Sequence, residues 1–515
     1  MYAAFEPPSS TERQVILSMS ATPTDAGTSP AEKTFLGHPR GLATLFNVEM
    51  WERFSYYGMR AILLYYLVDT AANGGLGLEE SLGQAVVATY GAAVYLLSII
   101  GGWLADRMIG ARRSVLYGGV IIMAGHLSLA APGAGFSWLG IALVALGTGL
   151  LKPNVSTMVG HLYADRDPRR DAGFSIFYVS INIGAFFAPF VVAFLRNRWG
   201  YHAGFSAAAV GMAIALVLYY LGRKQLDADS DTAPNPVDDA ERRRAGLVAV
   251  AVVLGVVALI GLLRVLRGGY AAAVIDTVSL LSVAASVGYF VVMFRSKRVT
   301  STERRHLRAY IPMWIAAVLF WMIFEQAASK MATFAAKRTD LDSLGFHFEE
   351  EWFQSINPIS ITLLAPLFGL IWLRRSGKFP STPMKFAMGV AIAGISFVLL
   401  GIAAASYEGP TAPVWVLGGV FVVQTLGELC LSPVGLSATT VLAPKAFASQ
   451  AMALWFLSSA TGQSIAAQAI RLTEDTPDGQ FFLVLGLVAV GFGVVLALLS
   501  PWAHRQIADA EPETA

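Results

Sequence analysis

Eight ionisable side chains lie inside apolar stretches of this sequence, where each charge costs from ~2.5 kcal/mol upward unless it is paired or hydrated. They are Glu49, Glu52, Arg53, Arg60, Lys152, Glu325, Lys330 and Glu428. Carboxylates in such surroundings can take up a proton when desolvation disfavours their charge, and release it beside an arginine. The chemistry that this set predicts is proton transfer and recognition of charged groups, so we do not expect an enzyme.

The first of these stretches carries a stripe of charge. Glu49, Arg53, Tyr56 and Arg60 are four, three and four residues apart, so a helix places them on one face, with Glu52 beside them. The stripe would be about 16 Å long at ~1.5 Å per residue. It could be a structural ladder of ion pairs, but two carboxylates and two guanidiniums exceed what one structural pair needs.

Lys152 and Glu428 occupy similar places in the two halves of the chain. Lys152 directly precedes Pro153, in a stretch whose helical backbone we expect to break easily, and Glu428 stands four residues before Ser432. The two could form a structural pair, or alternate between that pair and the two ends of a zwitterion. Lys330 is about 140° around a helix from Glu325 and receives no role.

Aromatic residues accompany the charges, and most aromatic residues in membranes serve packing or the interface. The cluster comprises Tyr56, Tyr57, Tyr65, Tyr66, Tyr90, Tyr95, Trp321 and Trp455. Tyr95 and Trp321 fall in the middle of their stretches, which makes them candidates for a pocket wall.

Composition excludes several classes of protein. Only 14% of the 515 residues are charged, against roughly 25% in a soluble protein, and the formal charge of +2 provides no basic field for nucleic acid. The single cysteine, Cys430, excludes intramolecular disulfides and cysteine metal cages. No Gly-x-x-x-x-Gly-Lys-[Ser/Thr] string is present, so we expect no nucleotide and no direct ATP drive. Secondary, proton-coupled transport is the natural inference.

Apolar stretches long enough to cross a bilayer alternate with short polar breaks from residue 41 onward. The fourteen predicted spans are 41–69, 82–106, 114–132, 138–161, 172–195, 203–222, 245–263, 271–294, 309–336, 353–373, 384–405, 412–440, 446–470 and 480–502. Breaks after even-numbered spans, together with the C-terminal tail, hold 23 of the 37 Lys and Arg residues, and the opposite face holds seven. Since positive loops remain in the cytoplasm, both termini are predicted to be cytoplasmic.

The breaks divide the chain into units. Residues 1–40 read as a disordered cytoplasmic tail, and the acidic stretch around Pro234 and Pro236 reads as a flexible linker. The extra pair of spans is expected to pack rather than to transport. The units are a tail 1–40, a six-helix bundle 41–222, a cytoplasmic linker 223–244, the extra pair 245–294, a second linker 295–308, a second six-helix bundle 309–502 and a tail 503–515.

Two motifs resemble a known family. The string Gly102-Trp103-Leu104-Ala105-Asp106-Arg107, followed by Gly110 and Arg112-Arg113, resembles the loop after the second helix of the major facilitator superfamily. The string Glu49-Met50-Trp51-Glu52-Arg53-Phe54-Ser55-Tyr56-Tyr57-Gly58 resembles the ExxERFxYYG signature of the proton-dependent oligopeptide transporter family. The resemblance implies an all-α membrane protein with the major facilitator fold, two six-helix bundles plus two extra helices.

The resemblance also implies roles for individual residues. Arg60 and Lys152 would meet the carboxylate of a peptide, and Asn182, Asn357 and Glu428 its amino end. Further residues would line the peptide site, namely Tyr56, Tyr57, Tyr95, Trp321, Ser432 and Trp455. The proton-coupling set would be Glu49, Glu52, Arg53 and Glu325. Mammalian members carry a coupling histidine in the second helix, whereas residues 82–106 contain none, so carboxylates must carry the proton here.

The expected function is a proton-coupled symporter of the bacterial inner membrane that imports di- and tripeptides by alternating access. Protons and the lipid bilayer are its other expected partners, and no cofactor is expected. A same-family transporter of nitrate or glucosinolates, a drug exporter of the same superfamily and a receptor or structural membrane protein are the alternatives. The opposed Lys152 and Glu428 favour a zwitterion.

A gate is predicted at the outer ends of two helices. Alignment on Tyr95 and Trp321 places Glu80 and Lys337 there, with the charges exchanged relative to some bacterial relatives, and the two could meet in the inward-facing state. The alternative is two solvated residues at helix ends. Lys152 and Glu428 complete the predicted set of gate residues.

Overall fold

The fold is built from long helices, as the apolar stretches predict. The computed structural model describes residues 34–164, 167–375 and 379–510, and within them fourteen helices of 19 residues or more. In chain order these are α2 Arg40–Val68, α3 Glu80–Leu104, α4 Ala111–Ala130, α5 Ala134–His161, α6 Arg170–Trp199, α7 Tyr201–Gly222, α8 Asp239–Arg267, α9 Tyr270–Arg295, α10 Ser301–Phe324, α12 Ile356–Arg374, α13 Thr382–Ser406, α14 Val414–Leu442, α15 Ala448–Leu472 and α16 Asp478–Ile507. Each overlaps one predicted span. Residues 1–33 of the predicted disordered tail lie outside the described residues.

Twelve helical segments of the described chain are long and apolar enough to cross a membrane. α2 and α15 are not among them. Every 18-residue window of α2 contains at least three of its charged residues, and α15 is rich in Ser, Thr and Gln. Both helices pack closely on several others, α2 on α6 and α7, and α15 on α3, α9 and α10.

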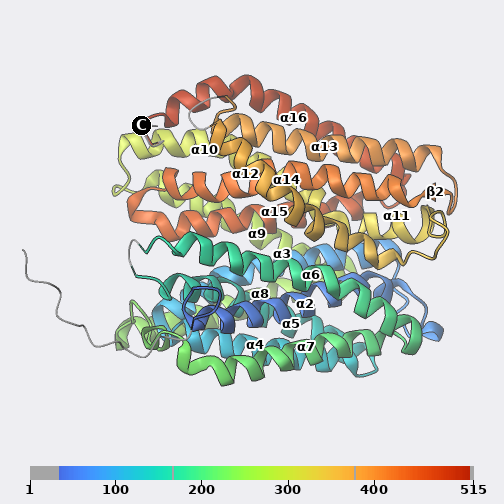
Figure 1. Cartoon of the computed structure of the whole chain (residues 1–515), viewed down its shortest axis with the longest axis horizontal. Helices are drawn as coiled ribbons and strands as arrows, with labels where there is room; N and C mark the ends of the chain where they lie inside the picture. The colour runs from blue at the N-terminus through green and yellow to red at the C-terminus, as the bar shows by residue number, and fades with distance from the viewer. Residues whose placement is uncertain (1–33, 165–166, 376–378, 511–515) are drawn as a thin grey trace, which may run out of the picture.

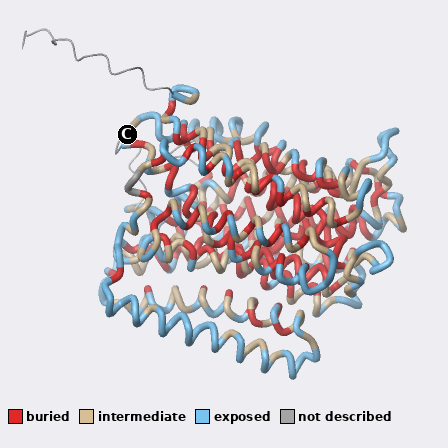
Figure 2. The backbone as a smooth tube through the Cα atoms, turned by 90° about the horizontal axis from the view of Figure 1, so that it is seen from below, coloured by how far each residue is buried: buried red, intermediate tan, exposed pale blue. Residues whose placement is uncertain are grey.

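Helices α2–α7 form one bundle and α10–α16 the other, with α3 and α15 packed together where the two bundles meet (Figure 1). α8 and α9 form a hairpin at the edge of the molecule (Figure 2). No residue of α8 is buried, whereas α9 packs on α15 through a polar face. In that face, Asp276 holds Arg471 of α15 at 2.7 Å, a contact that the sequence interpretation overlooked.

The predicted ninth span, 309–336, is not one continuous helix. α10 ends at Phe324, residues Glu325–Ala328 form a 3₁₀ turn, and Ser329 leaves the helical region with φ −127° and ψ −104°. The short helix α11 Lys330–Arg338 follows, and strand β1 Thr339–Asp340 pairs in parallel with β2 Ala412–Pro413. Hydropathy does not report the break, because all of these residues are compatible with a helix. The predicted 140° between Glu325 and Lys330 is wrong for this reason.

The stretch around Lys152 differs from its prediction in the opposite way, because a helix is continuous where a break was expected. α5 continues through Pro153, although proline removes one helical hydrogen bond. The amide of Asn154 donates to Leu150 O at 2.7 Å and to Gly101 O at 3.4 Å, so this side chain supplies hydrogen bonds to the carbonyls nearby. The expected easily broken segment is therefore part of a continuous helix that carries Lys152.

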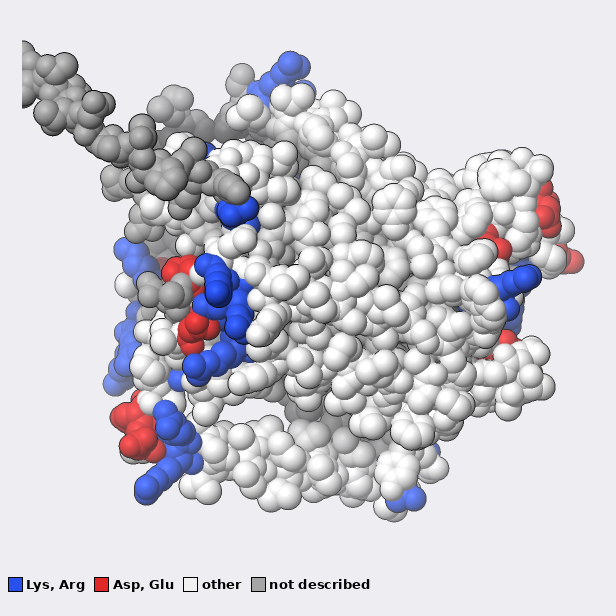
Figure 3. Space-filling model, turned by 60° about the horizontal axis from the view of Figure 1, so that its bottom comes forward, with Lys and Arg blue, Asp and Glu red and all other residues white. Residues whose placement is uncertain are grey.

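The predicted flexible linker is docked against the motif of Asp106 and Gly110. Asn235 N donates to Asp106 O at 3.0 Å, and Arg112 pairs with Asp231 at 2.6 Å. Gly110 has φ +79°, and a Cβ there would lie 2.7 Å from the backbone of Asp231, so only glycine fits. The composition of this segment predicts a flexible linker, because composition contains no information about these long-range contacts. Lys and Arg residues gather at the same end of the molecule (Figure 3).

Candidate functional site

The charged stripe of α2 is buried and internally paired. Arg53 Nε lies 3.1 Å from Glu49 Oε1 and 2.6 Å from Glu52 Oε2. All three side chains are at most 6% exposed, and the guanidinium lies 5.4 Å from the centre of the Tyr56 ring. One guanidinium therefore faces two carboxylates at membrane depth. With both carboxylates ionised, the group has one formal negative charge in excess, which a proton would neutralise.

Arg60, at the other end of the stripe, joins the two bundles. Its Nη2 forms an ion pair with Glu325 Oε2 and donates a hydrogen bond to Glu325 O at 3.1 Å. Glu325 is the first residue of the 3₁₀ turn after α10, so its carbonyl is available at the break in the helix. Arg60 thus contacts both the side chain and the main chain of Glu325, and both residues are buried.

Lys152 and Glu428 do not pair with each other in the described part of the chain. The Lys152 ammonium lies 4.0 Å from the centre of the Tyr95 ring, a cation–π contact. Glu428 accepts a 2.9 Å hydrogen bond from Asn357 Nδ2, which also reaches Thr425 Oγ1 at 3.0 Å. Lys152, Glu428 and Asn357 are all partly exposed, although Lys152 and Glu428 lie well inside α5 and α14 and Asn357 lies at the start of α12. Charges at this depth face a water-filled space or another protein group rather than lipid.

The remaining predicted substrate residues make contacts within their own helices. Tyr57 meets Tyr56 edge-on at 5.2 Å between ring centres, and Trp321 meets Phe324 edge-on at 5.5 Å. Asn182 donates to Tyr178 O of its own helix at 3.0 Å.

Ser432 belongs to α14, and Trp455 of α15 packs against the same helix. Trp455 lies over Gly435, where a Cβ would come within 2.1 Å of its indole ring. The glycine therefore makes room for the indole. The Ser432 hydroxyl is buried and has no hydrogen-bond partner among the described residues, so a donor and an acceptor remain available there.

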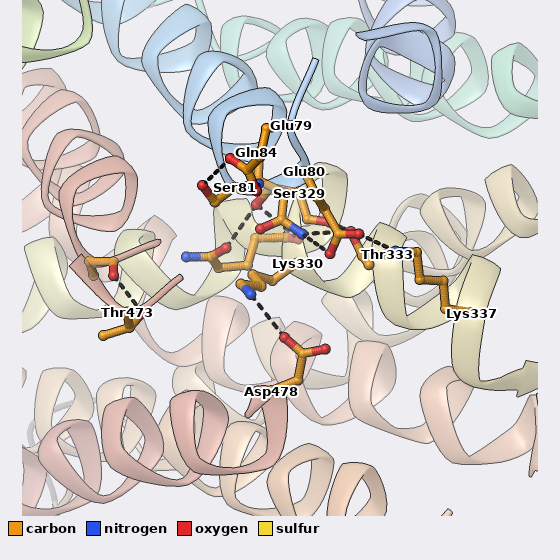
Figure 4. Close-up of polar contacts among 12 residues, drawn as sticks. Glu79, Glu80, Ser81, Gln84, Ser329, Lys330, Thr333, Lys337, Thr473 and Asp478 are labelled. Carbon is orange, nitrogen blue, oxygen red and sulfur yellow. Dashed lines mark hydrogen bonds and ion pairs between the residues drawn. The ribbon is translucent and has the colours of Figure 1, made fainter. Parts of the chain in front are cut away.

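The structure brings Glu80 and Lys337 into an ion pair at the end of the molecule opposite the C-terminus (Figures 1 and 4). Next to this pair, Gln84 Nε2 donates to Thr333 Oγ1 of α11 at 2.7 Å. Tyr65 also donates to Ala332 O at 3.2 Å. Residues of α2 and α3 thus hold α11, and the two bundles are in contact at this end.

A second contact at the same end was not predicted from the sequence. Arg196 at the end of α6 lies 2.8 Å from Glu350 and 2.7 Å from Glu351, which precede α12. The sequence did contain a signal for this contact. The basic end of one predicted span and the acidic start of another lie on the same side of the membrane. Carboxylate oxygens of Glu349, Glu350 and Glu351 lie within 4.8 Å of one another, a group that could hold a metal ion. The guanidinium of Arg196 already provides the positive charge that a metal ion would bring to these carboxylates.

Lys330 has a partner that the sequence did not indicate. Its ammonium lies 2.9 Å from Asp478 Oδ1, at the start of α16, and 5.2 Å from the centre of the Phe481 ring (Figure 4). The side chain is 6% exposed. This contact attaches α11 to α16 within the same bundle, so Lys330 fixes the segment that follows the helix break.

Comparison with known proteins gives one consistent answer. The sequence model of the POT family matches residues 112–484. An uncharacterized transporter of Bacillus subtilis (strain 168) is 46% identical over 93% of this chain and 96% of its own length. A di-/tripeptide transporter of Lactococcus lactis subsp. cremoris is 43% identical over 91% of this chain and 96% of its own length.

Solved structures agree with the sequence relatives. The crystal structure of a peptide transporter POT in complex with sulfate superimposes with a TM-score of 0.88 at 45% identity. The match covers 92% of this chain and 97% of that one. The likeness therefore extends over both bundles and the hairpin.

Proposed function

This chain belongs to the POT family, and we propose that it imports di- and tripeptides together with protons. It is a multi-pass membrane transporter. The observation that carries the proposal is the Arg60–Glu325 pair between the bundles, with Lys152 and Glu428 nearby and not paired with each other. The name of the Lactococcus relative supports the substrate class.

The two ends of a peptide would bind to opposite charges. Arg60 and Lys152 would take the carboxylate, because a guanidinium and an ammonium both donate to it with charge-assisted hydrogen bonds. Glu428 would take the amino group, and Asn357 already holds the Glu428 carboxylate from one side. Asn182 would turn from its own helix toward the same end of the peptide.

The side chains of the peptide would meet the uncharged residues of the site. Tyr57, Tyr95 and Trp321 are partly exposed, whereas Tyr56, Trp455 and the hydroxyl of Ser432 are buried. Aromatic walls accept many side chains of different shape, because their contribution is mostly apolar contact. This arrangement suits a transporter of many di- and tripeptides.

Proton coupling would use the carboxylates already paired with arginine. Protonation of Glu325 removes the charge that holds Arg60, which frees the guanidinium for the peptide carboxylate. The Glu49–Glu52–Arg53 group holds one excess negative charge, so it can accept a second proton without a change of partner. Both groups are buried inside the protein.

The conformation corresponds to a state closed at the outer end. Glu80–Lys337 and Arg196–Glu350 join the bundles there, and we assign this end to the outside because the basic residues gather at the other (Figure 3). Both termini are then cytoplasmic, in the inner membrane of a bacterium. Lys152 and Glu428 would pair as the inner gate in the outward-facing state.

Uptake of a labelled dipeptide into proteoliposomes tests the proposal. An inward gradient of 100 mV moves one unit charge with about 2.3 kcal/mol, enough for roughly fifty-fold accumulation per proton. A protonophore should abolish accumulation, and Glu325→Gln should abolish gradient-driven uptake while peptide counterflow persists. Glu408→Gln, in an exposed loop, is the matched control and should behave as the parent protein. Accumulation that survives the protonophore would refute proton coupling.

A further inference from the structure

A groove on the lipid-facing surface lies between α9 and α10. Its volume is about 460 Å³, and apolar side chains form most of its walls. The walls include Val287, Phe290, Val291, Ile311, Trp314 and Ile315. Val287 and Val291 are 57% and 45% exposed, so the groove is open toward the membrane rather than toward the transport path.

The groove exists because the polar contacts of α9 go to α15, whereas α9 meets α10 through Phe290, whose ring lies edge-on to Trp314 at 5.4 Å between ring centres. Ser286 Oγ of α9 lies 2.9 Å from Thr461 Oγ1, and Asp276 pairs with Arg471 at 2.7 Å. Trp314 of α10 also turns toward α15, where its indole donates to Leu454 O at 2.8 Å. The polar faces of both helices are thus satisfied elsewhere, and their apolar faces are left facing one gap.

Two arginines stand at the basic end of this groove. Arg295, the last residue of α9, is one of its lining residues. Arg308 precedes Ile311 by three residues and Ile315 by seven, so it lies on the same face of α10. The helices are antiparallel, and the groove sets Ile311–Ile315 against Val287–Arg295, which places Arg308 near the level of Arg295.

The charges of these two arginines are not compensated by the protein. Neighbouring basic residues have partners, since Arg305 pairs with Asp509 at 2.6 Å and Arg304 donates to Ser296 O at 2.8 Å. Arg295 and Arg308 form no ion pair with a carboxylate within the described ranges, and both are exposed. An apolar groove therefore ends at two unpaired cations, at the surface that the proposed orientation makes cytoplasmic.

We propose that this groove is a binding site for one anionic phospholipid of the cytoplasmic leaflet. An acyl chain lies along the apolar walls, and the phosphate of the headgroup binds Arg295 and Arg308. Basic pockets between transmembrane helices at the cytoplasmic side bind anionic headgroups, and each cation near the surface strengthens the attraction. The lipid then fills the gap that the attachment of α9 to α15 leaves beside α10.

Native mass spectrometry of the full chain, titrated with phosphatidylglycerol and separately with phosphatidylcholine of the same acyl chains, tests the site. The double variant Arg295→Gln/Arg308→Gln should bind phosphatidylglycerol about 30-fold more weakly. Val291→Trp should lose the lipid with both charges in place, because the indole fills the groove. Arg243→Gln/Arg244→Gln, at the exposed start of α8, is the matched control and should bind as the parent protein.

Three outcomes would overturn the proposal. Undiminished binding of phosphatidylglycerol by the Arg295/Arg308 variant would exclude these arginines. Equal affinity of the parent protein for phosphatidylcholine would exclude headgroup charge. Retention by Val291→Trp with loss by the arginine variant would place the lipid on the surface rather than in the groove. Unchanged dipeptide uptake by each variant in phosphatidylcholine liposomes shows that the proteins are folded.

Discussion

Replacing Arg196 by glutamine should open the outer end far more than replacing Lys337 by glutamine. The Arg196 side chain is 13% exposed, and its partners Glu350 and Glu351 are 16% and 0% exposed. Removing one partner of a buried ion pair costs about 3 kcal/mol, which corresponds to roughly a 100-fold shift of the equilibrium. Lys337 and Glu80 are 64% and 32% exposed, so the loss of that pair is worth at most about 1 kcal/mol, or ~5-fold.

Distance measurements between spin labels report the equilibrium directly. Ala72→Cys and Glu408→Cys place labels on exposed loops of the two bundles at the outer end, after the single buried Cys430 is replaced by alanine. The outer-open population should rise strongly in Arg196→Gln and only slightly in Lys337→Gln. The effect of Arg196→Gln should shrink at low pH, because protonation of the freed carboxylates relieves their repulsion.

Equal populations in the two variants would refute the reasoning from burial. The ion pair of Lys337 with Glu80 would then be as important for closure as the contact of Arg196. Glu80→Lys with Lys337→Glu separates charge from shape, since the exchanged pair should restore the transport rate that Glu80→Lys alone lowers.

Three further predictions follow from local contacts. Lys152→Ala and Glu428→Ala should each weaken dipeptide binding by about 2–5 kcal/mol, measured by competition, and N-acetylation of the peptide should mimic the loss of Glu428. The hydrogen bond to Asp342 raises the pKa of His347, so Asp342→Asn should lower that pKa in an NMR titration. The contact stabilises the loop at low pH, and this stabilisation is lost as the pH rises through the raised pKa. Gly110→Ala should lower the stability in detergent by ~1–3 kcal/mol, measured by thermal unfolding, because alanine is strained at φ +79°.

The sequence predicts the helices well because membrane spans are long and uniformly apolar. Every predicted span overlaps one long helix of the structure, and the identified family agrees with the resemblance carried by Glu49–Gly58. The edges are less accurate. α10 begins at Ser301 rather than near residue 309, because its first two turns are basic and hydropathy assigns them to a loop. The capping box of Thr300 and Glu303 marks the true start.

Pairings within the site were only partly predictable. The spacing of Glu49, Arg53 and Arg60 places them on one face from the sequence alone, since a single helix fixes their relation. Which partner each charge takes across the bundles depends on the tertiary structure. The sequence assigns Arg60 to the peptide and Glu325 to proton coupling. It does not predict that the two side chains pair with each other when neither ligand is bound. Lys330 received no role because its partner Asp478 is 148 residues away.

The Arg60–Glu325 pair explains why a peptide and a proton would be carried together. A peptide carboxylate that takes Arg60 alone leaves the Glu325 carboxylate buried and ionised, which costs several kcal/mol. A proton that neutralises Glu325 alone leaves the buried guanidinium of Arg60 without a counter-charge. When both bind, each former partner is satisfied, so each ligand increases the affinity for the other by the same factor. The hydrogen bond of Arg60 to the Glu325 carbonyl is independent of the proton, and it keeps the guanidinium at the helix break while the carboxylate changes its charge.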